Sequence, residues 1–255
     1  MKKPQHPLPW LSAGEPFPPL ALAWGPSDPA PGLLAAGGAL DVSTLVAAYS
    51  QGIFPWFSDG QPILWWSPNP RMVLQTSQFK LHRSLRQSIA RFRANAACEI
   101  RLDSAFTEVI TACAHAPREG QNGTWIVPDM VEAYCALHRA GHAHSVETWV
   151  AGQLVGGLYC INLGGMVFGE SMFARATDAS KIALAALVAF CRAHGISLID
   201  CQQNTRHLAS LGAAEITREQ FCQHLPPAIA LSAPQWEFKP LYWQKIMLKK
   251  ALELA

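Results

Sequence analysis

Three strand-like segments in immediate succession, followed by an apolar helix and a buried strand, constrain the fold of this chain more than any other feature. The three segments run over 145–150, 153–161 and 166–171. Asp178 then precedes a strongly apolar helical segment that ends at Gly195, and Leu198–Gln202 follows directly. This order of strands, helix and strand is typical of a sheet covered by helices. We therefore predict a mixed α/β fold.

Further periodic segments surround this unit. A strand is predicted at 72–74, and helices are predicted at 81–92 and 128–139. A further helix should follow a cap at Asp103 or Ser104, another should run from a cap at Asn204 to Leu211, and a last one should follow the capping box of Thr217 and Gln220.

The first 31 residues hold nine prolines, which disfavour helix at their own and at the preceding positions. We expect an extended, irregular arm there, followed by a short helix that Asp41 caps and Gly52 stops. The predicted organisation is an arm at 1–31, a small N-terminal domain at 32–70, a larger domain at 71–232 and a tail at 233–255. Within the tail, Lys245–Leu254 has the pattern of a cationic amphipathic helix.

Composition excludes several classes of protein. Hydrophobic residues make up 50% and charged residues 15%, which is too apolar for a disordered chain. No apolar segment approaches the ~20 residues that span a bilayer, and prolines follow the basic N-terminus where a secretory signal would be apolar. Seven cysteines without a C-x-x-C pair favour reduced thiols. We expect a cytosolic protein with no membrane association.

Charge is distributed unevenly. The net charge of +2 implies no polyanionic partner by itself. However, no acidic residue lies between Asp59 and Glu99. The basic side chains of that interval are Arg71, Lys80, Arg83, Arg86, Arg91 and Arg93. The helix predicted at 81–92 is therefore cationic as well as amphipathic.

Several familiar catalytic motifs are absent from the sequence. It contains no Walker-type phosphate loop, no G-x-G-x-x-G, no G-x-S-x-G and no H-E-x-x-H. His142 and His144 would share one face of a strand, but no third ligand lies at a recognisable spacing. We interpret them as ordinary histidines and predict no metal.

The segment Leu198–Gln202 carries a carboxylate at the end of an apolar strand. Burying Asp200 is costly, so it should have a partner or a task. Strand alternation predicts that Asp200 and Gln202 point together into a cleft while Cys201 faces away. A purely structural carboxylate is the competing interpretation.

The segment Phe168–Phe173 places a carboxylate beside a thioether. Alternation puts Phe168, Glu170 and Met172 on one face. Such a face could hold an ammonium group at one end and an apolar side chain at the other. A strand end with a solvated Glu170 explains the pattern equally well.

Tryptophans near glycines and near the basic helix form a third group of candidates. Trp56, Trp65, Trp66 and Trp125 are flat surfaces suited to stacking on nucleobases. Packing in the core is the default interpretation for each of them.

Seven segments taken in order give the sequence a clear resemblance to a known family. They are Gly32–Gly38, Gly52–Phe57, Ile63–Arg71, Gly123–Ile126, Gly141–Ser145, Gly169–Phe173 and Leu198–Gln202. Each is weak alone, but together they resemble the bacterial leucyl/phenylalanyl-tRNA-protein transferases from about Gly32 to about Glu215.

The resemblance implies a small N-terminal domain followed by an N-acyltransferase domain. It also implies transfer of leucine or phenylalanine, with methionine as a further candidate, from aminoacyl-tRNA to proteins with N-terminal Arg or Lys, which marks them for degradation. The acetyl-CoA-dependent relatives carry an [RQ]-x-x-G-x-[GA] loop that this sequence lacks. We therefore expect Leu-tRNA and Phe-tRNA as donors, no cofactor, and a monomer.

The resemblance also assigns residues, which fall into three groups. Asp200 and Gln202 match the catalytic pair. The residues that match substrate-binding positions are Trp56 and Trp125 for the terminal adenosine, and Leu158, Glu170, Met172, Phe173 and Ile199 for the esterified amino acid. Arg83, Arg86 and Arg91 lie in the helix that meets the tRNA body, where charge alone is matched.

The chemistry follows from the bond to be broken. An aminoacyl ester is already activated, so the enzyme must mainly position an unprotonated amine and stabilise the oxyanion. We expect Asp200 to accept the amine proton, directly or through Gln202, or to attract the cationic acceptor. A covalent route through Cys201 competes weakly. A CoA-dependent small-molecule N-acyltransferase and a non-catalytic tRNA-binding protein are the alternative functions.

Overall fold

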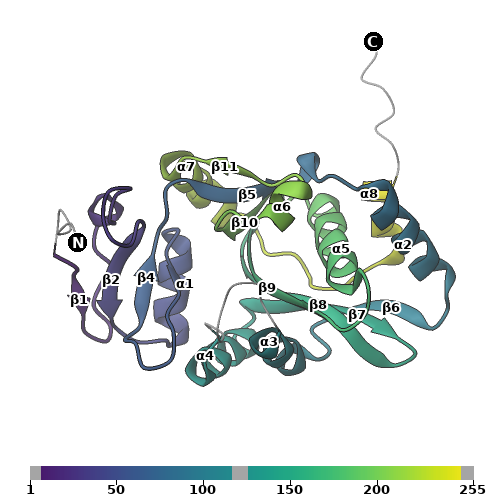
Figure 1. Cartoon of the computed structure of the whole chain (residues 1–255), viewed down its shortest axis with the longest axis horizontal. Coiled ribbons are helices and arrows are strands. Elements are labelled where there is room, and N and C mark those ends of the chain that lie inside the picture. Colours follow the sequence, from purple (N-terminus) through teal and green to yellow (C-terminus); the bar gives the residue numbers. More distant parts are fainter. Residues whose placement is uncertain (1–6, 117–125, 248–255) are drawn as a thin grey trace, which may run out of the picture.

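Two β-sheets organise the chain, a small one near the N-terminus and a large one that carries most of the helices (Figure 1). The computed structural model describes residues 7–116 and 126–247. The small sheet has the strand order β1-β2-β4-β3, and the large sheet has the order β11-β5-β10-β9-β8-β7-β6. The predicted mixed α/β fold with a small N-terminal domain is confirmed.

The small sheet includes part of the proline-rich segment. The elements of this N-terminal part of the chain are β1 (Trp10–Leu11), η1 (Leu20–Leu22), β2 (Leu33–Gly37), α1 (Val42–Ser50), β3 (Phe54–Pro55) and β4 (Leu64–Trp66). Because β1 pairs with β2 in parallel, the proline-rich segment contributes an edge strand. Asp41 caps α1 as predicted, since its carboxylate accepts the Thr44 N–H at 2.9 Å.

The large sheet is antiparallel except at one place. Its strands are β5 (Arg71–Gln75), β6 (Cys98–Leu102), β7 (Ala143–Val150), β8 (Gln153–Leu163), β9 (Met166–Ala174), β10 (Leu198–Gln202) and β11 (Ala214–Ile216). Only β9 and β10 run in parallel, because the long helix α5 (Ala179–Ala193) connects them. All the strands and helices that the sequence predicts between residues 71 and 232 are present in the described part of the chain; β6 and β11 were not predicted.

Helices cover both faces of the large sheet and enclose two apolar cores. On one face, α3 (Phe106–His115) and α4 (Pro128–Arg139) share a core with α1 and α7 (Arg218–Ile229). On the other face, α5 packs with α2 (Arg83–Ala94) and α8 (Gln244–Met247) (Figure 1). The remaining short elements are η2 (Thr76–Gln78), α6 (Arg206–Ser210) and η3 (Pro240–Trp243). In the described ranges, no helix has the length and apolar character needed to cross a bilayer.

Helix caps follow the sequence prediction in part. The capping box of Thr217 and Gln220 at α7 is confirmed. Thr205, rather than Asn204, caps α6. The prediction that Asp103 or Ser104 caps α3 is wrong, because no side chain caps that helix. The Asp103 carboxylate instead contacts His144, and the Ser104 hydroxyl donates to Glu147.

The C-terminal segment packs on the α5 side of the sheet. The Trp236 indole stacks on the His144 ring with centroids 4.0 Å apart, and Trp243 and Ile246 are buried. The Arg86 guanidinium donates to the Met247 carbonyl at 2.6 Å. The segment predicted as a helix up to Leu254 lies, after Met247, outside the described residues.

Candidate active site

Two β-bulges on neighbouring strands shape the candidate site. Strands β9 and β10 pair only at Val167–Ile199 and Phe168–Asp200. Just beyond these pairs, Glu170 is an extra residue in β9 relative to β8, and Cys201 is an extra residue in β10 relative to β5. A bulge interrupts the alternation of side chains and redirects them, and bulges are frequent beside active sites.

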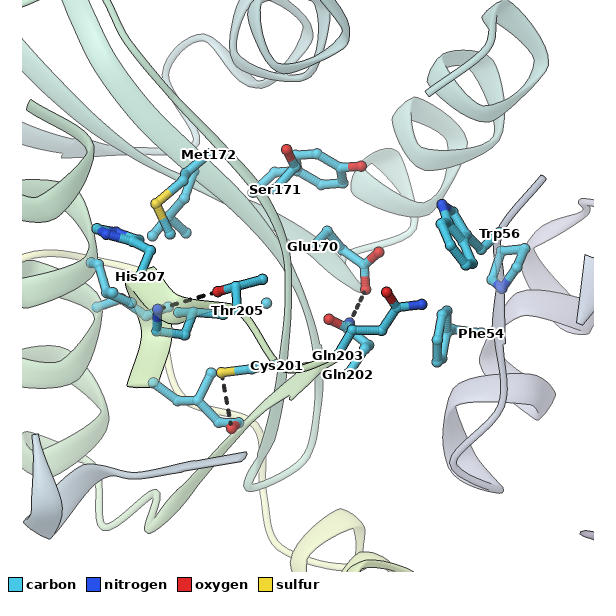
Figure 2. A pocket seen from close by; sticks show the side chains of 18 residues that line it. Phe54, Trp56, Glu170, Ser171, Met172, Cys201, Gln202, Gln203, Thr205 and His207 are labelled. Atoms are coloured by element: carbon cyan, nitrogen blue, oxygen red, sulfur yellow. Dashed lines mark hydrogen bonds between the residues drawn. The ribbon is translucent and has the colours of Figure 1, made fainter. Parts of the chain in front are cut away.

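A cavity of about 320 Å³ opens at these bulges (Figure 2). Its walls come from the N-terminal domain at Phe54–Trp56, from β8, β9 and β10, and from α5 and α6. In Figure 2, Phe54 and Trp56 lie near Gln202 and Glu170, whereas Met172 and His207 lie at the other end. The cavity therefore has one end with a carboxylate and an amide, and another that is mainly apolar.

The apolar chamber is lined by side chains from strands and helices alike. Its apolar members are Leu158, Met172, Leu184, Leu187, Ile199 and Leu208. Leu158, Met172 and Ile199 were predicted here, and Leu158 lies directly opposite Met172 in the β8–β9 pair. Phe173, which the resemblance assigns to substrate binding, does not line the cavity. Its side chain belongs to the core on the opposite face, as alternation along β9 requires.

Glu170 is the carboxylate that faces the cavity. It accepts hydrogen bonds from the Tyr49 hydroxyl at 2.8 Å, from the Tyr134 hydroxyl at 3.4 Å and from the Gln202 amide at 3.1 Å. Burial raises the pKa of Glu170 to about 8; the charge of Asp200 adds to this, and the hydrogen bonds from the two tyrosines oppose it. A carboxyl group of this kind exchanges a proton near neutral pH.

Asp200 does not face the cavity. Its carboxylate is fully buried, with Oδ1 2.8 Å from Arg71 Nε and Oδ2 2.6 Å from Arg71 Nη2. The prediction that Asp200 and Gln202 point together into the cleft is therefore wrong for Asp200. Ile199 and Cys201 line the cavity, so strand alternation turns Asp200 to the other face, and the bulge at Cys201 brings Gln202 to the cavity side. The sequence predicted that this costly buried charge has a partner or a task, and the structure gives Arg71 as the partner.

Gln202 and Cys201 take the positions that the bulge gives them. The Gln202 backbone has a positive φ of 55°, and its N–H donates to Asp200 Oδ1 at 3.0 Å, while its side chain lines the cavity. Cys201 also lines the cavity, contrary to the prediction that it faces away. Burial raises the pKa of its thiol far above the ordinary value, so the thiol stays protonated and is a poor nucleophile.

Indoles from the N-terminal domain border the polar end. Trp56 lines the cavity, and the Trp66 indole N–H donates to the Trp56 carbonyl at 2.7 Å. The two rings lie with centroids 5.3 Å apart. Trp65 is fully buried and belongs to the core. Trp125 lies outside the described residues.

The predicted basic residues all lie on α2. Arg83 and Arg91 are exposed, whereas Arg86 is partly buried and bonded to the C-terminal segment. Two of the three guanidinium groups are therefore presented to solvent.

His144, one of the two histidines considered as metal ligands, is held by contacts within the protein. His144 contacts Asp103 Oδ2 at 2.7 Å and stacks on Trp236. Within 7–116 and 126–247, no three His, Cys, Asp or Glu side chains are grouped as they would be around a metal ion.

Sequence reasoning missed Arg71, Tyr49 and Tyr134 as parts of the site. Arg71 had one signal, a charge at the start of an apolar strand. The tyrosines gave no comparable signal, because each occupies an ordinary apolar position of a helix and only the fold brings them to Glu170.

Comparison with known proteins agrees with the resemblance. Residues 73–226 match the family model "Leucyl/phenylalanyl-tRNA protein transferase", and residues 38–69 match the model of its N-terminal domain. The leucyl/phenylalanyl-tRNA–protein transferase of Polaromonas sp. strain JS666 is 70% identical over 97% of both chains, and that of Albidiferax ferrireducens is 60% identical over 99% of both. Among solved structures, FemX aligns with 71% of this chain and 70% of its own at 11% identity and a TM-score of 0.42.

Proposed function

Because the chain belongs to the leucyl/phenylalanyl-tRNA–protein transferase family and is therefore an aminoacyltransferase, we propose that it transfers leucine or phenylalanine from Leu-tRNA or Phe-tRNA to proteins that begin with Arg or Lys. Methionine is a further donor candidate. The product carries a new N-terminal residue that marks the protein for degradation. We place this activity in the cytosol, where charged tRNA is made, and assign it to a monomer.

One observation carries the proposal: a single cavity joins an apolar chamber to a titratable polar end. The chamber suits an apolar side chain that is not branched at Cβ, such as that of leucine or phenylalanine. The polar end offers Glu170 and Gln202 to the ester carbonyl and to the incoming amine. Trp56 lies beside this end and suits the terminal adenosine, with Trp125 as the second indole proposed from the resemblance.

The reaction needs only proton transfer and positioning. The α-amine nitrogen attacks the ester carbonyl carbon, and the bond from that carbon to the ribose oxygen breaks. Glu170, with its pKa near 8, takes the proton that the amine loses and returns it to the departing ribose oxygen. The Gln202 amide hydrogen-bonds to the reacting groups, and Asp200 acts indirectly by holding the Gln202 backbone.

The acceptor's cation is drawn to the same end of the cavity. The sequence predicts this attraction for Asp200, but the charge of Asp200 is paired with Arg71. Glu170 is the carboxylate that lines the cavity, so the ionised Glu170 is the better partner for the cationic N-terminal residue. On α2, Arg83 and Arg91 are placed to contact the tRNA backbone, with Arg86 contributing charge from a fixed position.

A CoA-dependent reaction is disfavoured by the N-terminus of α5. A helix N-terminus is the usual place for a phosphate group. Here Asp178 occupies it, with its carboxylate bonded to Ser88 Oγ at 2.8 Å and to Lys181 Nζ at 3.0 Å.

A single assay tests the proposal against both alternatives. Radiolabelled leucyl-tRNA is incubated with the protein and with peptides that begin with Arg, Lys or Ala. We expect label in the Arg and Lys peptides only. Label in none of the peptides, with tRNA binding intact, would support a silent tRNA-binding protein. Binding of acetyl-CoA with acetylation of a small amine would support the CoA-dependent alternative.

A further inference from the structure

Arg71 is the most completely enclosed cation among the described residues, and it contacts two parts of the molecule at once. Its side chain is about 1% exposed. Toward β10 it forms the two-pronged ion pair with Asp200. Toward the N-terminal domain, Nη1 donates to the Gly52 carbonyl at 3.1 Å. The guanidinium carbon also lies 4.9 Å from the centre of the Phe54 ring and 4.6 Å from that of Phe221.

The contact with β10 reaches Gln202 through one shared atom. Asp200 Oδ1 accepts from Arg71 Nε and also from the Gln202 N–H at 3.0 Å. The Gln202 backbone has a positive φ, which residues other than glycine rarely adopt, so the contacts around Gln202 must hold it in this conformation. The orientation of the carboxylate thus determines where the Gln202 amide points, and Arg71 determines the orientation of the carboxylate.

The contact with the N-terminal domain reaches the opposite wall of the cavity. Gly52 begins the segment that supplies Phe54, Pro55 and Trp56 to the lining. The guanidinium bonds the carbonyl at the start of this segment and lies against the Phe54 ring. Arg71 therefore links the wall that carries Trp56 to the wall that carries Gln202.

A buried ion pair is weak evidence of stability, because removing both charges from water costs about as much as the pairing returns. The double contact of Arg71 is explained better by what it holds in place. We propose that Arg71 is a positioning residue of the transferase, which fixes the distance between the two walls of the cavity and aims the Gln202 amide. This inference rests on the proposed function and adds to it a residue outside the cavity lining.

The test replaces the ion pair by an apolar pair. Arg71→Met with Asp200→Leu leaves no buried charge unpaired, so its urea unfolding midpoint should stay close to that of wild type. Transfer of leucine to an Arg-peptide is then measured at varied leucyl-tRNA, together with equilibrium binding of 3′-leucylamido-adenosine, whose amide cannot react as the ester does. We expect kcat to fall at least tenfold, and KM and the analogue Kd each to rise at least fivefold.

A merely structural role predicts a different result. Loss of folded protein lowers the apparent kcat in proportion to the folded fraction and leaves KM and Kd unchanged. Arg192→Met is the matched control, since Arg192 donates to the carbonyls of Thr76 and Lys245 and does not line the cavity. It should lower the unfolding midpoint without changing KM or Kd.

Two outcomes overturn the inference. One is a folded double variant with wild-type KM, Kd and kcat. If the double variant does not fold, Arg71→Lys is measured instead, because lysine keeps the charge but loses the planar fork. An unchanged KM and kcat in Arg71→Lys is the second outcome. Absence of transfer by the wild type itself would instead refute the proposed function, and the analogue Kd would still report on the cavity.

Discussion

Replacing Glu170 by glutamine should make the protein more stable and less active at the same time. The substitution keeps the size of the side chain and retains an oxygen that can accept from Tyr49 and Gln202. It removes the one feature that sets Glu170 apart, a carboxyl group with a pKa near 8 that lies against two buried hydroxyl groups. Stability and activity therefore report on the same group in opposite directions.

The size of the stability effect follows from the pKa. A folded-state pKa of about 8, against an ordinary 4.5, means that the unfolded chain loses this proton first as pH rises. The contribution of Glu170 to stability is complete below pH 4.5 and is lost between pH 4.5 and 8. At about 1.36 kcal/mol per pKa unit, the full loss is about 5 kcal/mol. Because the Glu170 side chain is partly exposed and lines the cavity, we expect a smaller loss of about 2 to 4 kcal/mol.

Urea unfolding of wild type and Glu170→Gln at pH 5, 6, 7, 8 and 9 measures this directly. The difference in unfolding free energy should grow in favour of the variant up to pH 8 and then level off, since other titrating groups cancel in the difference. The kcat of the variant should fall about 100-fold, as expected for loss of a proton acceptor. A difference in stability that does not change with pH, or a kcat near that of wild type, would refute the reasoning.

Three further substitutions test the substrate contacts. Trp56→Ala should raise KM for leucyl-tRNA by about 5- to 150-fold, as expected for about 1 to 3 kcal/mol of stacking, whereas Trp10→Ala, at an exposed indole, should leave KM unchanged in the same steady-state assay. The double variant Arg83→Ala with Arg91→Ala should reduce the magnitude of the slope of log kcat/KM against log salt concentration by roughly 1 to 2. An unchanged slope would mean that these residues are not part of the tRNA interface. Leu184→Trp should fill the apolar chamber and lower kcat/KM for phenylalanyl-tRNA roughly 10-fold more than for leucyl-tRNA, and equal losses for both donors would mean that the side chain lies elsewhere.

Local patterns in the sequence were sufficient for most of the fold. The helix over Pro128–Arg139 has the predicted bounds, and the strand over Leu198–Gln202 begins one residue after the predicted start at Ser197. Each rests on a run of apolar residues with clear end signals. The capping box at Thr217 was predictable for the same reason, since its two hydrogen bonds join residues three positions apart.

The geometry of the site was less accessible, because it depends on two insertions relative to partner strands. The bulges at Glu170 and Cys201 exist only with respect to β8 and β5, so no pattern within β9 or β10 reveals them. The bulge at Cys201 is why Gln202 lines the cavity beside Cys201 and does not share the face of Asp200. The partnership of Asp200 with Arg71 joins residues 129 positions apart, and sequence reasoning identified only that some partner was required.

The packing of Trp236, Trp243 and Ile246 on the α5 side of the sheet has a consequence for how the chain can be shortened. A chain cut after residue 232, where the recognisable motifs have ended, would uncover the apolar surface of α5 beneath Trp243 and Ile246. It would also remove the Met247 carbonyl that accepts from Arg86 and one of the two carbonyls that accept from Arg192. The last described segment is thus the outer layer of one core. A shortened enzyme would keep every motif but would expose an apolar surface that favours aggregation.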